Sequence, residues 1–316
     1  MKGIIFTGER KLELRDFPDP TPGPGEVVLE IKASGMCGSD LKFYRAAPGG
    51  GSASLGLGGA GKVVIAGHEP CGVVVAVGDG VNEKQARIGM RAMQHHYRGC
   101  AACAQCATGW MQLCVEGVAE VYGVTANGAH TRYLKCPART LVPLPDELSY
   151  STGAATQLAS SLGARVIALD TSPRRLQRAG ELGAQVLINP GNGDDVLAAI
   201  KACTGGLGAD LSLDASSAPS ARRQAVQCVR TWGKACFVGE GGEVNLDVSN
   251  DLLRRQVTLL GSWTFSTVGQ AECAKFVAER KIDIDQLFTH HWRLDQAEEA
   301  YQVFDRQTSG KGVFLM

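Results

Sequence analysis

The second half of the chain alternates between helix and strand patterns, and no other sequence feature constrains the fold as strongly. From about Thr156 onward, amphipathic segments typical of helices are separated by short apolar segments typical of strands. Such a βαβ series predicts a parallel sheet with helices on both faces. The expected helices are 155–164, 173–183, 193–205 and 220–233, and the expected strands are 165–170, 184–189, 209–215, 234–239 and 257–262.

The first half of the chain has a β-rich pattern instead. Glu26–Ala33, Cys71–Val77 and Gly89–Met93 are β-branched or alternating stretches bounded by Gly, Pro and Asp, which predicts short strands. The Gly/Ser-rich segment Ala46–Gly61 is interpreted as a flexible surface loop or as a mobile flap over a site. At 316 residues the chain is about twice the usual length of one domain, so we expect two domains.

Charge and composition exclude several classes of function. The 32 Lys and Arg residues balance the 32 Asp and Glu residues, and 44% of the chain is hydrophobic, so we expect a globular protein without a nucleic-acid-binding surface. No uncharged apolar run is long enough for a membrane span, and the residues after Met1 lack a signal-peptide core. A cytoplasmic protein without membrane contact is expected. The 11 cysteines are odd in number and locally grouped, which favours metal ligation over disulfides.

One local group of cysteines has the spacing of a metal site. Cys100, Cys103, Cys106 and Cys114 form the pattern C-x2-C-x2-C-x7-C. Four thiolates at this spacing can close a tetrahedron around Zn²⁺ and leave no open position for a substrate, so a zinc site here is expected to be structural. An iron–sulfur cluster competes with this interpretation, although no proline follows the fourth cysteine. Unliganded cysteines are the third interpretation.

A second group of metal-ligand residues is spread over two segments. Residues 35–40 read GMCGSD, and residues 67–72 read GHEPCG at the head of an apolar strand. Each segment alone is a weak signal, because a lone buried cysteine is usually a small hydrophobe and a Gly-His-Glu is usually a surface turn. Together with the four cysteines downstream, the order of these parts resembles the zinc-dependent medium-chain alcohol dehydrogenase family, including its sorbitol and threonine dehydrogenase branches. The resemblance runs from Met1 to the closing residues 310–313.

The resemblance implies a fold and an activity. It implies a GroES-like zinc-binding catalytic domain over 1–150, completed by about 288–316, and a Rossmann-type nucleotide-binding domain over 151–287. It also implies an oxidoreductase that transfers a hydride between a small secondary alcohol or polyol and NAD. A homodimer or homotetramer is the expected assembly.

Site residues follow from the resemblance position by position. Cys37, His68 and Glu69 match the catalytic zinc ligands, and Ser39 matches the hydroxyl that passes the substrate proton outward. Such a ligand set holds Zn²⁺ as a Lewis acid and leaves a position open for water or alcohol. Asp40 is interpreted either as a carboxylate that orients a ligand or as a turn cap.

Three further positions are less clearly assigned. Family members often carry a histidine three residues after the serine, but this chain has Lys42 there, so the outer end of the proton relay is unassigned. His95 and His96 precede the four cysteines. We expect them to be turn or core residues rather than residues of the cleft.

Asp170 closes an expected strand of the second domain. In a Rossmann unit, an acidic residue at the end of the second strand binds the adenosine ribose hydroxyls and would repel a 2′-phosphate, which favours NAD over NADP. Arg175 follows within one turn of the next helix. It is interpreted either as a contact to the adenosine or as an ordinary exposed helix arginine.

The turn that should bind the pyrophosphate is missing before Asp170. A G-x-G-x-x-G turn is expected about 20 residues earlier, but residues 150–155 read YSTGAA, with one glycine and no apolar strand before them. The join at Ala155/Thr156 therefore omits about one βα unit, roughly 30 residues. This unit supplies the central strand of the sheet and, by the resemblance, the fourth zinc ligand. Either the natural protein has residues that this sequence lacks, or the protein carries a true deletion.

Three functions are weighed against each other. The leading hypothesis is the NAD-dependent zinc alcohol or polyol dehydrogenase. The alternative is a truncated, non-catalytic zinc-binding relative that does not bind dinucleotide. A zinc hydrolase or lyase is the third, but no further acid–base group has the support of a motif.

Overall fold

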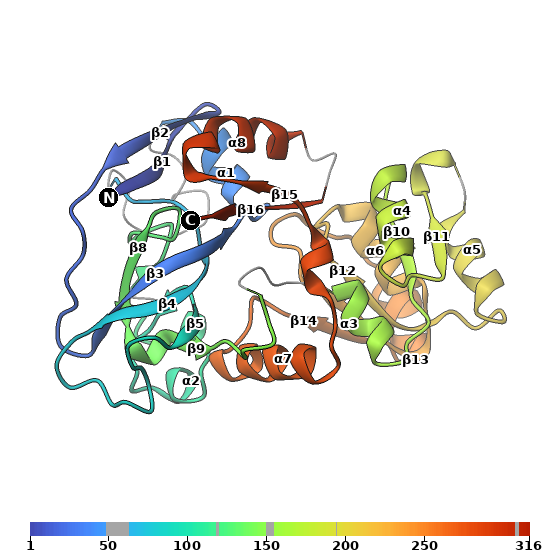
Figure 1. Ribbon diagram of the computed structural model, residues 1–316. Coiled ribbons are helices and arrows are strands. Elements are labelled where there is room, and N and C mark those ends of the chain that lie inside the picture. Colours follow the sequence, from blue (N-terminus) through green and yellow to red (C-terminus); the bar gives the residue numbers. More distant parts are fainter. Residues whose placement is uncertain (49–62, 118–119, 150–154, 194, 307–309) are drawn as a thin grey trace. The chain divides into compact units, whose positions relative to one another are not determined.

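The computed structural model describes residues 1–48, 63–117, 120–149, 155–193, 195–306 and 310–316 (Figure 1). These residues form two compact units. Unit 1 contains Met1–Ala155 and Ser266–Met316, and unit 2 contains Thr156–Phe265. No helix in the described parts of the chain is long and apolar enough to cross a membrane.

Unit 1 is built on a seven-stranded sheet in which β3 (Glu26–Gly35) is the central strand. It pairs antiparallel with β4, β8 and β16. Its apolar side chains Val27, Leu29 and Ile31 are fully buried in the main core, because alternate residues of a strand point to the same face. The other strands are β4 Glu69–Val77, β5 Arg91–Gln94, β8 Tyr133–Pro137, β9 Leu141–Pro143, β15 Phe288–Trp292 and β16 Lys311–Leu315, in the order β15-β16-β3-β4-β5-β9.

Two small sheets and several short helices complete unit 1. The small sheets pair β1 with β2 and β6 with β7. Their strands are β1 Lys2–Gly8, β2 Lys11–Asp16, β6 Tyr97–Arg98 and β7 Glu120–Val121. The helices are α1 Asp40–Arg45, α2 Ala104–Ala107, α7 Thr267–Glu279 and α8 Ala297–Asp305, with 3₁₀ turns η2 Met111–Leu113, η3 Ala138–Thr140, η7 Ile284–Leu287 and η8 Leu294–Gln296.

An aromatic core joins the two ends of the chain within unit 1. Ile4 of β1, Tyr44 of α1, Tyr301 of α8 and Phe314 of β16 are buried together, and Figure 1 shows α1 and α8 near each other above the large sheet. The ring centroids of Tyr44 and Tyr301 are 5.3 Å apart. Elements from both ends of the sequence therefore pack against Met36 and Leu41, which follow β3.

The chain returns to unit 1 at Ser266, earlier than the expected boundary near residue 288. Helix α7 packs against β9 of unit 1, and the amide of Gln270 lies 3.7 Å from the sulfur of Met93. The sequence of α7 looks like one more helix of the helix–strand series in the second half of the chain. The sequence pattern therefore did not indicate that this helix packs on unit 1.

Unit 2 confirms the alternation of helices and parallel strands. β10 pairs parallel with β11, and β13 pairs parallel with both β12 and β14. Its strands are β10 Ile167–Leu169, β11 Val186–Ile188, β12 Ala209–Asp214, β13 Val229–Phe237 and β14 Thr258–Gly261. Its helices are α3 Ala155–Ser161, α4 Pro173–Glu181, α5 Val196–Cys203 and α6 Pro219–Gln227, with short turns η4 Pro190–Asn192, η5 Val248–Leu252 and η6 Leu253–Arg255.

The boundary between one predicted helix and its strand is wrong. The helix expected over 220–233 ends at Gln227, and β13 begins at Val229 instead of near residue 234. Val229 is fully buried and pairs with Ala209 of β12. Strand pairing and burial outweigh the local helix propensity of these residues.

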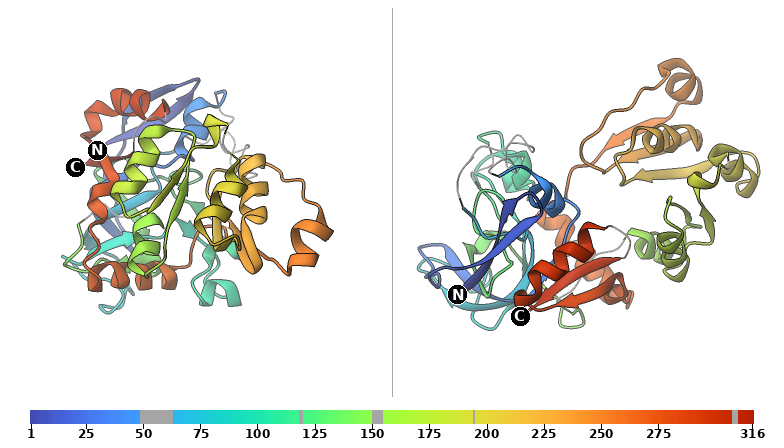
Figure 2. Two further views of the ribbon diagram at one scale, coloured as in Figure 1. Left: turned by 90° about the vertical axis from the view of Figure 1, so that its right-hand side faces the viewer. Right: turned by 90° about the horizontal axis from the view of Figure 1, so that it is seen from above.

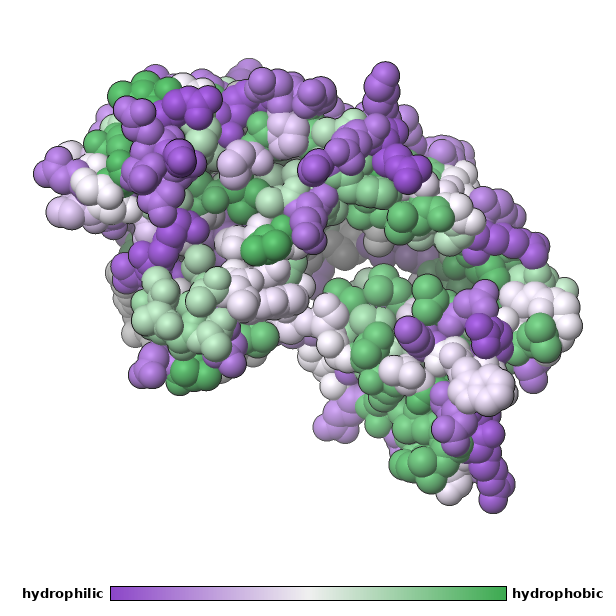
Figure 3. Space-filling view, turned by 90° about the horizontal axis from the view of Figure 1, so that it is seen from below, coloured by the Kyte–Doolittle hydropathy of each residue, from purple (hydrophilic) through white to green (hydrophobic). Residues whose placement is uncertain are grey.

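The described strands of unit 2 form two sheets rather than one. β10 and β11 form one sheet, and β12, β13 and β14 form the other (Figure 2). In the described part of unit 2, β10 pairs only with β11 and β12 pairs only with β13, so each has one edge without a partner strand. Leu211 and Leu213 of β12 have exposed fractions of 68% and 56%, and Figure 3 shows apolar areas on one face of the molecule. Residues 150–154, just before the predicted join, and most of the Gly/Ser-rich segment, from residue 49, lie outside the described residues.

Candidate metal centres and nucleotide site

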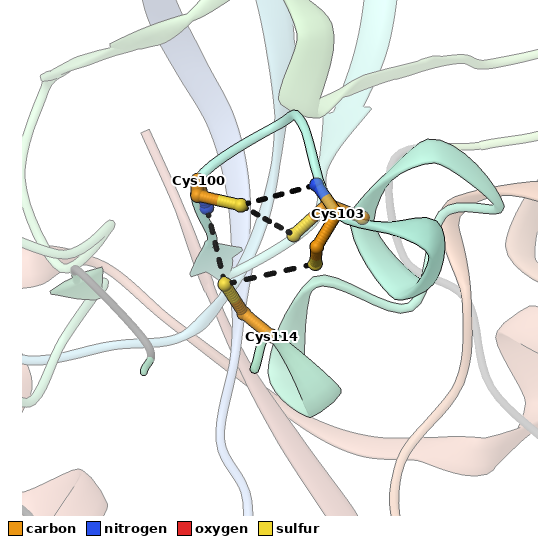
Figure 4. Close-up of side chains that lie close together, drawn as sticks. Cys100, Cys103 and Cys114 are labelled. Atoms are coloured by element: carbon orange, nitrogen blue, oxygen red, sulfur yellow. Dashed lines mark hydrogen bonds between the residues drawn. The ribbon is translucent and has the colours of Figure 1, made fainter. Parts of the chain in front are cut away.

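The four cysteines converge in one loop of unit 1 that contains α2 and η2. Their sulfur atoms all lie within 4.8 Å of one another. The sulfurs of Cys100 and Cys106 are 4.0 Å apart, as are those of Cys103 and Cys114 (Figure 4). A tetrahedral zinc site with bonds of about 2.3 Å requires sulfur separations of about 3.8 Å, so the four side chains fit a zinc ion.

Backbone N–H groups of the same loop point at these sulfurs. The N–H groups of Ala102 and Cys103 donate to the Cys100 sulfur over 3.4 and 3.3 Å, and they lower the pKa of that thiol. The N–H of Cys106 is the main cause that lowers the pKa of Cys103 to about 6, whereas burial raises the pKa of Cys106 to about 12. The loop therefore stabilises thiolates, the form that binds metal, at its more exposed cysteines.

The register of β3 and β4 creates the second centre. Gly35, the last residue of β3, pairs with Glu69, the first residue of β4. Cys37 therefore lies beside His68 and Glu69, and one ligand atom from each of the three lies within 4.8 Å of the others. Glycine at position 35 leaves room for the Glu69 carboxylate, because a Cβ there would overlap it and force the Glu69 side chain to move.

Asp40 contacts both His68 and Cys37. One carboxylate oxygen lies 3.0 Å from Nδ1 of His68, and the other accepts the N–H of Cys37 over 2.9 Å. Asp40 is therefore both a turn cap and a partner of the candidate ligand. Burial opposes the charge on both side chains, but their attraction lowers the pKa of Asp40 and raises the pKa of His68 well above its usual value.

The remaining ring nitrogen of His68 faces Ser39. The hydroxyl of Ser39 lies 3.1 Å from Nε2 of His68. Because Nδ1 is occupied by Asp40, Nε2 is the atom available to a metal. The structure thus brings together Cys37, Ser39 and His68 in one cluster.

Lys311 of β16 is a site residue that the sequence analysis did not predict. Its ammonium group lies 2.7 and 2.5 Å from the two carboxylate oxygens of Glu69. No local motif marks Lys311, because β15, β16 and β3 must pair before it reaches Glu69. This cation partly balances the negative charge of the carboxylates of Glu69 and Asp40 at the centre.

The two neighbouring histidines occupy different environments. His95 is fully buried, and burial lowers its pKa to about 4. The ring of His96 is 5.3 Å from that of His68, centroid to centroid, so it borders the second centre. The expectation of a turn or core residue holds for His95, whereas His96 lies next to the candidate ligand His68.

In unit 2, the two candidate cofactor residues contact each other. Asp170 follows β10, and its carboxylate accepts the N–H of Ser172 over 2.8 Å. The Arg175 guanidinium on α4 lies 3.8 Å from the same carboxylate. Both side chains are partly exposed, so their polar atoms remain accessible to a ligand.

Comparison with known proteins identifies the family to which the two-domain fold belongs. Residues 23–146 match the family model of the alcohol dehydrogenase GroES-like domain, and residues 153–280 match that of the zinc-binding dehydrogenase. The chain belongs to the family of zinc-type medium-chain alcohol dehydrogenases. The predicted family and the predicted α/β two-domain fold are confirmed.

Several curated relatives match nearly the whole chain. The uncharacterized zinc-type alcohol dehydrogenase-like protein YphC of Escherichia coli K12 is 31% identical, covering 99% of this chain and 98% of the relative. L-threonine 3-dehydrogenase of Symbiobacterium thermophilum is 29% identical (97% and 96%), and sorbitol dehydrogenase of Bacillus subtilis is 26% identical (96% and 93%). The alignment with YphC extends over 353 residues, whereas this chain has 316. That relative therefore has residues without a counterpart here.

Solved structures share the fold at lower sequence identity. The alcohol dehydrogenase TADH from Thermus sp. ATN1 has a TM-score of 0.85 and 22% identity, covering 100% of this chain and 99% of its own. A dehydrogenase (rspB) from Escherichia coli CFT073, complexed with NADH, has a TM-score of 0.84, 23% identity and the same coverage. A putative zinc-binding dehydrogenase from Sinorhizobium meliloti 1021, bound to NADP, has a TM-score of 0.81, 21% identity and the same coverage.

Proposed function

We propose that this protein is a zinc-dependent oxidoreductase that transfers a hydride between a small secondary alcohol or polyol and NAD. The observation that carries the proposal is the meeting of Cys37, His68 and Glu69 within 4.8 Å, with the hydroxyl of Ser39 beside His68. A three-residue ligand set that leaves a position open is typical of catalytic rather than structural zinc.

The residues around this centre have different proposed roles. Zinc at the centre supplies a Lewis acid for the alcohol oxygen, and a nicotinamide ring supplies the hydride acceptor. Ser39 lies where it can accept the substrate proton, since its hydroxyl is 3.1 Å from the available nitrogen of His68. Asp40 keeps Nδ1 of His68 occupied, so the ring presents Nε2 toward the open position.

The four-cysteine loop is proposed to hold a second, structural zinc ion. Its four sulfurs lie within 4.8 Å of one another, and four thiolates would fill all positions of a tetrahedral zinc ion and leave a substrate no place to bind. Zinc there would tie α2 and η2 together and order the loop.

The dinucleotide preference is proposed from one strand end in unit 2. A carboxylate at the position of Asp170, after β10, favours ribose hydroxyls over a 2′-phosphate. The structural neighbours do not decide between the cofactors, because one was solved with NADH and another with NADP. NAD is therefore a proposal that rests on Asp170.

The substrate class is proposed from the relatives. The names of two relatives, threonine dehydrogenase and sorbitol dehydrogenase, are those of enzymes that act on small hydroxyl compounds. We therefore propose that the substrate is a small secondary alcohol or polyol. We also propose that the protein assembles as a homodimer or homotetramer.

A chain that keeps both zinc sites but does not bind dinucleotide is the alternative. The division of the unit 2 strands into two sheets supports it, because the strand that holds a pyrophosphate turn belongs between β10 and β12. In the described part of unit 2, Asp170 is the residue proposed to bind ribose, and that part contains no pyrophosphate turn. The comparisons do not favour this alternative, since dehydrogenases match the chain over nearly its whole length.

A single substitution tests the proposed metal centre. His68→Ala removes a ligand, and we expect it to lower the zinc content from two ions to one per chain and to abolish alcohol oxidation, because two remaining ligands hold zinc poorly against water. His291→Ala, at an exposed histidine of β15, is the matched control and should retain both. The measurements are metal analysis and NAD reduction with a panel of alcohols and polyols. Full activity of His68→Ala would contradict the proposal.

A further inference from the structure

The chain returns from unit 2 to unit 1 beside the four-cysteine loop. Ser266 is the first residue after unit 2, and helix α7 begins at Thr267. The N–H of Thr267 donates to the backbone carbonyl of Gly109 over 3.0 Å. Gly109 belongs to the four-cysteine loop, between Cys106 and Cys114, and Figure 1 shows α7 next to α2 of this loop. The first N–H groups of a helix lack partners within the helix, and the loop supplies a partner for one of them.

Gly109 connects this hydrogen bond to a candidate metal ligand. Its own N–H donates to the carbonyl of Cys106 over 3.1 Å. Its φ of +86° lies in the left-handed region that favours glycine. A Cβ on Gly109 would lie 2.4 Å from Oγ1 of Thr267 and 3.2 Å from its nitrogen, so a side chain there would displace the loop or the helix start. Two successive backbone hydrogen bonds therefore join Cys106 to the first residue of α7.

Further contacts hold the first turn of α7 on unit 1. Ser266 is 5% exposed, and its hydroxyl oxygen accepts the N–H of Gly269 over 2.9 Å, which is the usual role of a serine before a helix. In the same turn, the amide of Gln270 lies 3.7 Å from the sulfur of Met93 in β5. The loop, the cap and β5 together fix this turn.

The segment just before the fixed turn has an unusual backbone. Thr264 has a φ of +55°, which a β-branched residue rarely adopts. Its hydroxyl oxygen is buried and has no hydrogen-bond partner among the described residues. Such a conformation persists only where the surrounding structure holds it in place. The fixed helix start at Thr267, three residues later, is one such support.

We propose that the four-cysteine loop anchors the segment by which the chain returns from unit 2 to unit 1, so that metal binding in the loop holds residues 262–270 in place. The inference rests on the proposed structural zinc ion and gives that ion a role beyond ordering its own loop. Coupling of this kind is reciprocal. Zinc in the loop should stabilise the start of α7, and the contact with α7 should strengthen zinc binding in the loop.

Hydrogen exchange measures the effect of the metal on the segment. Removal of the loop zinc by Cys103→Ser should speed amide exchange over residues 266–270 about 2- to 10-fold, the factor expected for loss of one backbone hydrogen bond. Exchange in β13, where Ala235 is fully buried in unit 2, is the internal reference and should not change. Cys273→Ser, at an exposed cysteine of α7, is the matched control and should exchange like the wild type.

Two substitutions at Thr267 measure the reverse effect and leave all four cysteines in place. Thr267→Pro removes the N–H that binds Gly109, and proline is well tolerated at the first position of a helix. Ser266 is already extended, with φ −84° and ψ 160°, as a residue before proline must be. We expect Thr267→Pro to bind the loop zinc about 2- to 10-fold more weakly in competition with a chelator. Thr267→Ala keeps the N–H and should retain the wild-type affinity.

The outcomes distinguish this inference from the proposed function. Equal exchange over residues 266–270 in Cys103→Ser and in a wild type that has zinc in the loop would overturn the inference alone. Equal zinc affinity of Thr267→Pro and Thr267→Ala would also overturn it, and this comparison remains valid if Cys103→Ser does not fold. A wild-type loop that binds no zinc would contradict the proposed structural metal site and the inference with it.

Discussion

At the scale of single residues, a carboxylate partner decides which of the buried histidines of this protein carries charge. His68 lies against Asp40 and has a raised pKa, whereas burial lowers the pKa values of His95 and His130 to about 4. The sequence indicated His68 through its Gly-His-Glu motif. It contained no comparable signal for His130, whose partners Ser34 and Tyr301 are distant in the sequence.

The depressed pKa values predict that acid destabilises the fold. Between pH 6.5 and 4, the unfolded chain binds protons at His95 and His130 that the folded chain does not bind, so unfolding becomes more favourable as the pH falls. Each histidine should lower the free energy of unfolding by about 3 kcal/mol between pH 7 and pH 4. His130→Gln should remove its share of this dependence, as measured by urea unfolding at several pH values with zinc present.

The comparison between wild type and His130→Gln is the control for that prediction. Protonation of the metal ligands affects both proteins equally, so it cancels in the difference of their unfolding free energies. Parallel pH profiles for the two proteins would show that His130 is already charged in the folded state or that it titrates normally there.

At the scale of elements, the two metal centres differ in how much of the fold they need. The four-cysteine centre is contained in one loop with α2 and η2, and local N–H groups already direct the sulfurs of Cys100 and Cys103. The second centre depends on the register of β3 and β4, because Cys37 reaches Glu69 only when Gly35 pairs with Glu69. The spacing of the four cysteines therefore predicted the first centre directly. For the second centre, a family resemblance was needed to connect the segment of Cys37 with the segment of His68 and Glu69.

The four-cysteine loop predicts a structural effect of one substitution. Cys103→Ser should lower the zinc content by one ion and reduce the melting temperature, by about 2–4 °C for each kcal/mol of stability lost. Cys273→Ser, at an exposed cysteine on α7, should change neither quantity. Metal analysis and calorimetry of the two variants provide the measurement. Unchanged zinc content in Cys103→Ser would refute the structural role of this loop, and visible absorption with bound iron would indicate a cluster instead.

At the scale of the whole molecule, the strand order of unit 2 bears directly on dinucleotide binding. The separate sheets β10-β11 and β12-β13-β14 are what remains when one strand between β10 and β12 is taken out of the strand order 3-2-1-4-5-6. The exposed side chains of Leu211 and Leu213 on β12 are consistent with a face that such a βα unit would cover. We infer that a unit of this kind is missing at the join Ala155/Thr156.

Cofactor titration and intact mass together test this inference. If the natural chain contains the extra unit, NADH should bind with clear preference over NADPH, and Asp170→Ser should narrow that preference because the carboxylate that repels a 2′-phosphate is removed. If the chain has 316 residues, the pyrophosphate lacks its turn and NADH binding should fall below detection by fluorescence or calorimetry. Tight binding by a chain of proven length 316 would refute the need for this unit, and no binding by a longer chain would refute the dehydrogenase assignment.

The sequence by itself determined the features that depend on neighbours along the chain. Four cysteines within 15 residues (100–114) define a metal loop, and the helix–strand alternation after Thr156 defines parallel strands, because both patterns act through local geometry. Tertiary structure alone decided what lies behind the second centre. Lys311 reaches Glu69 and Tyr301 reaches His130 only after β16 and α8 have packed on unit 1. Burial and charged partners together, rather than any motif, set the charge of the residues that meet there.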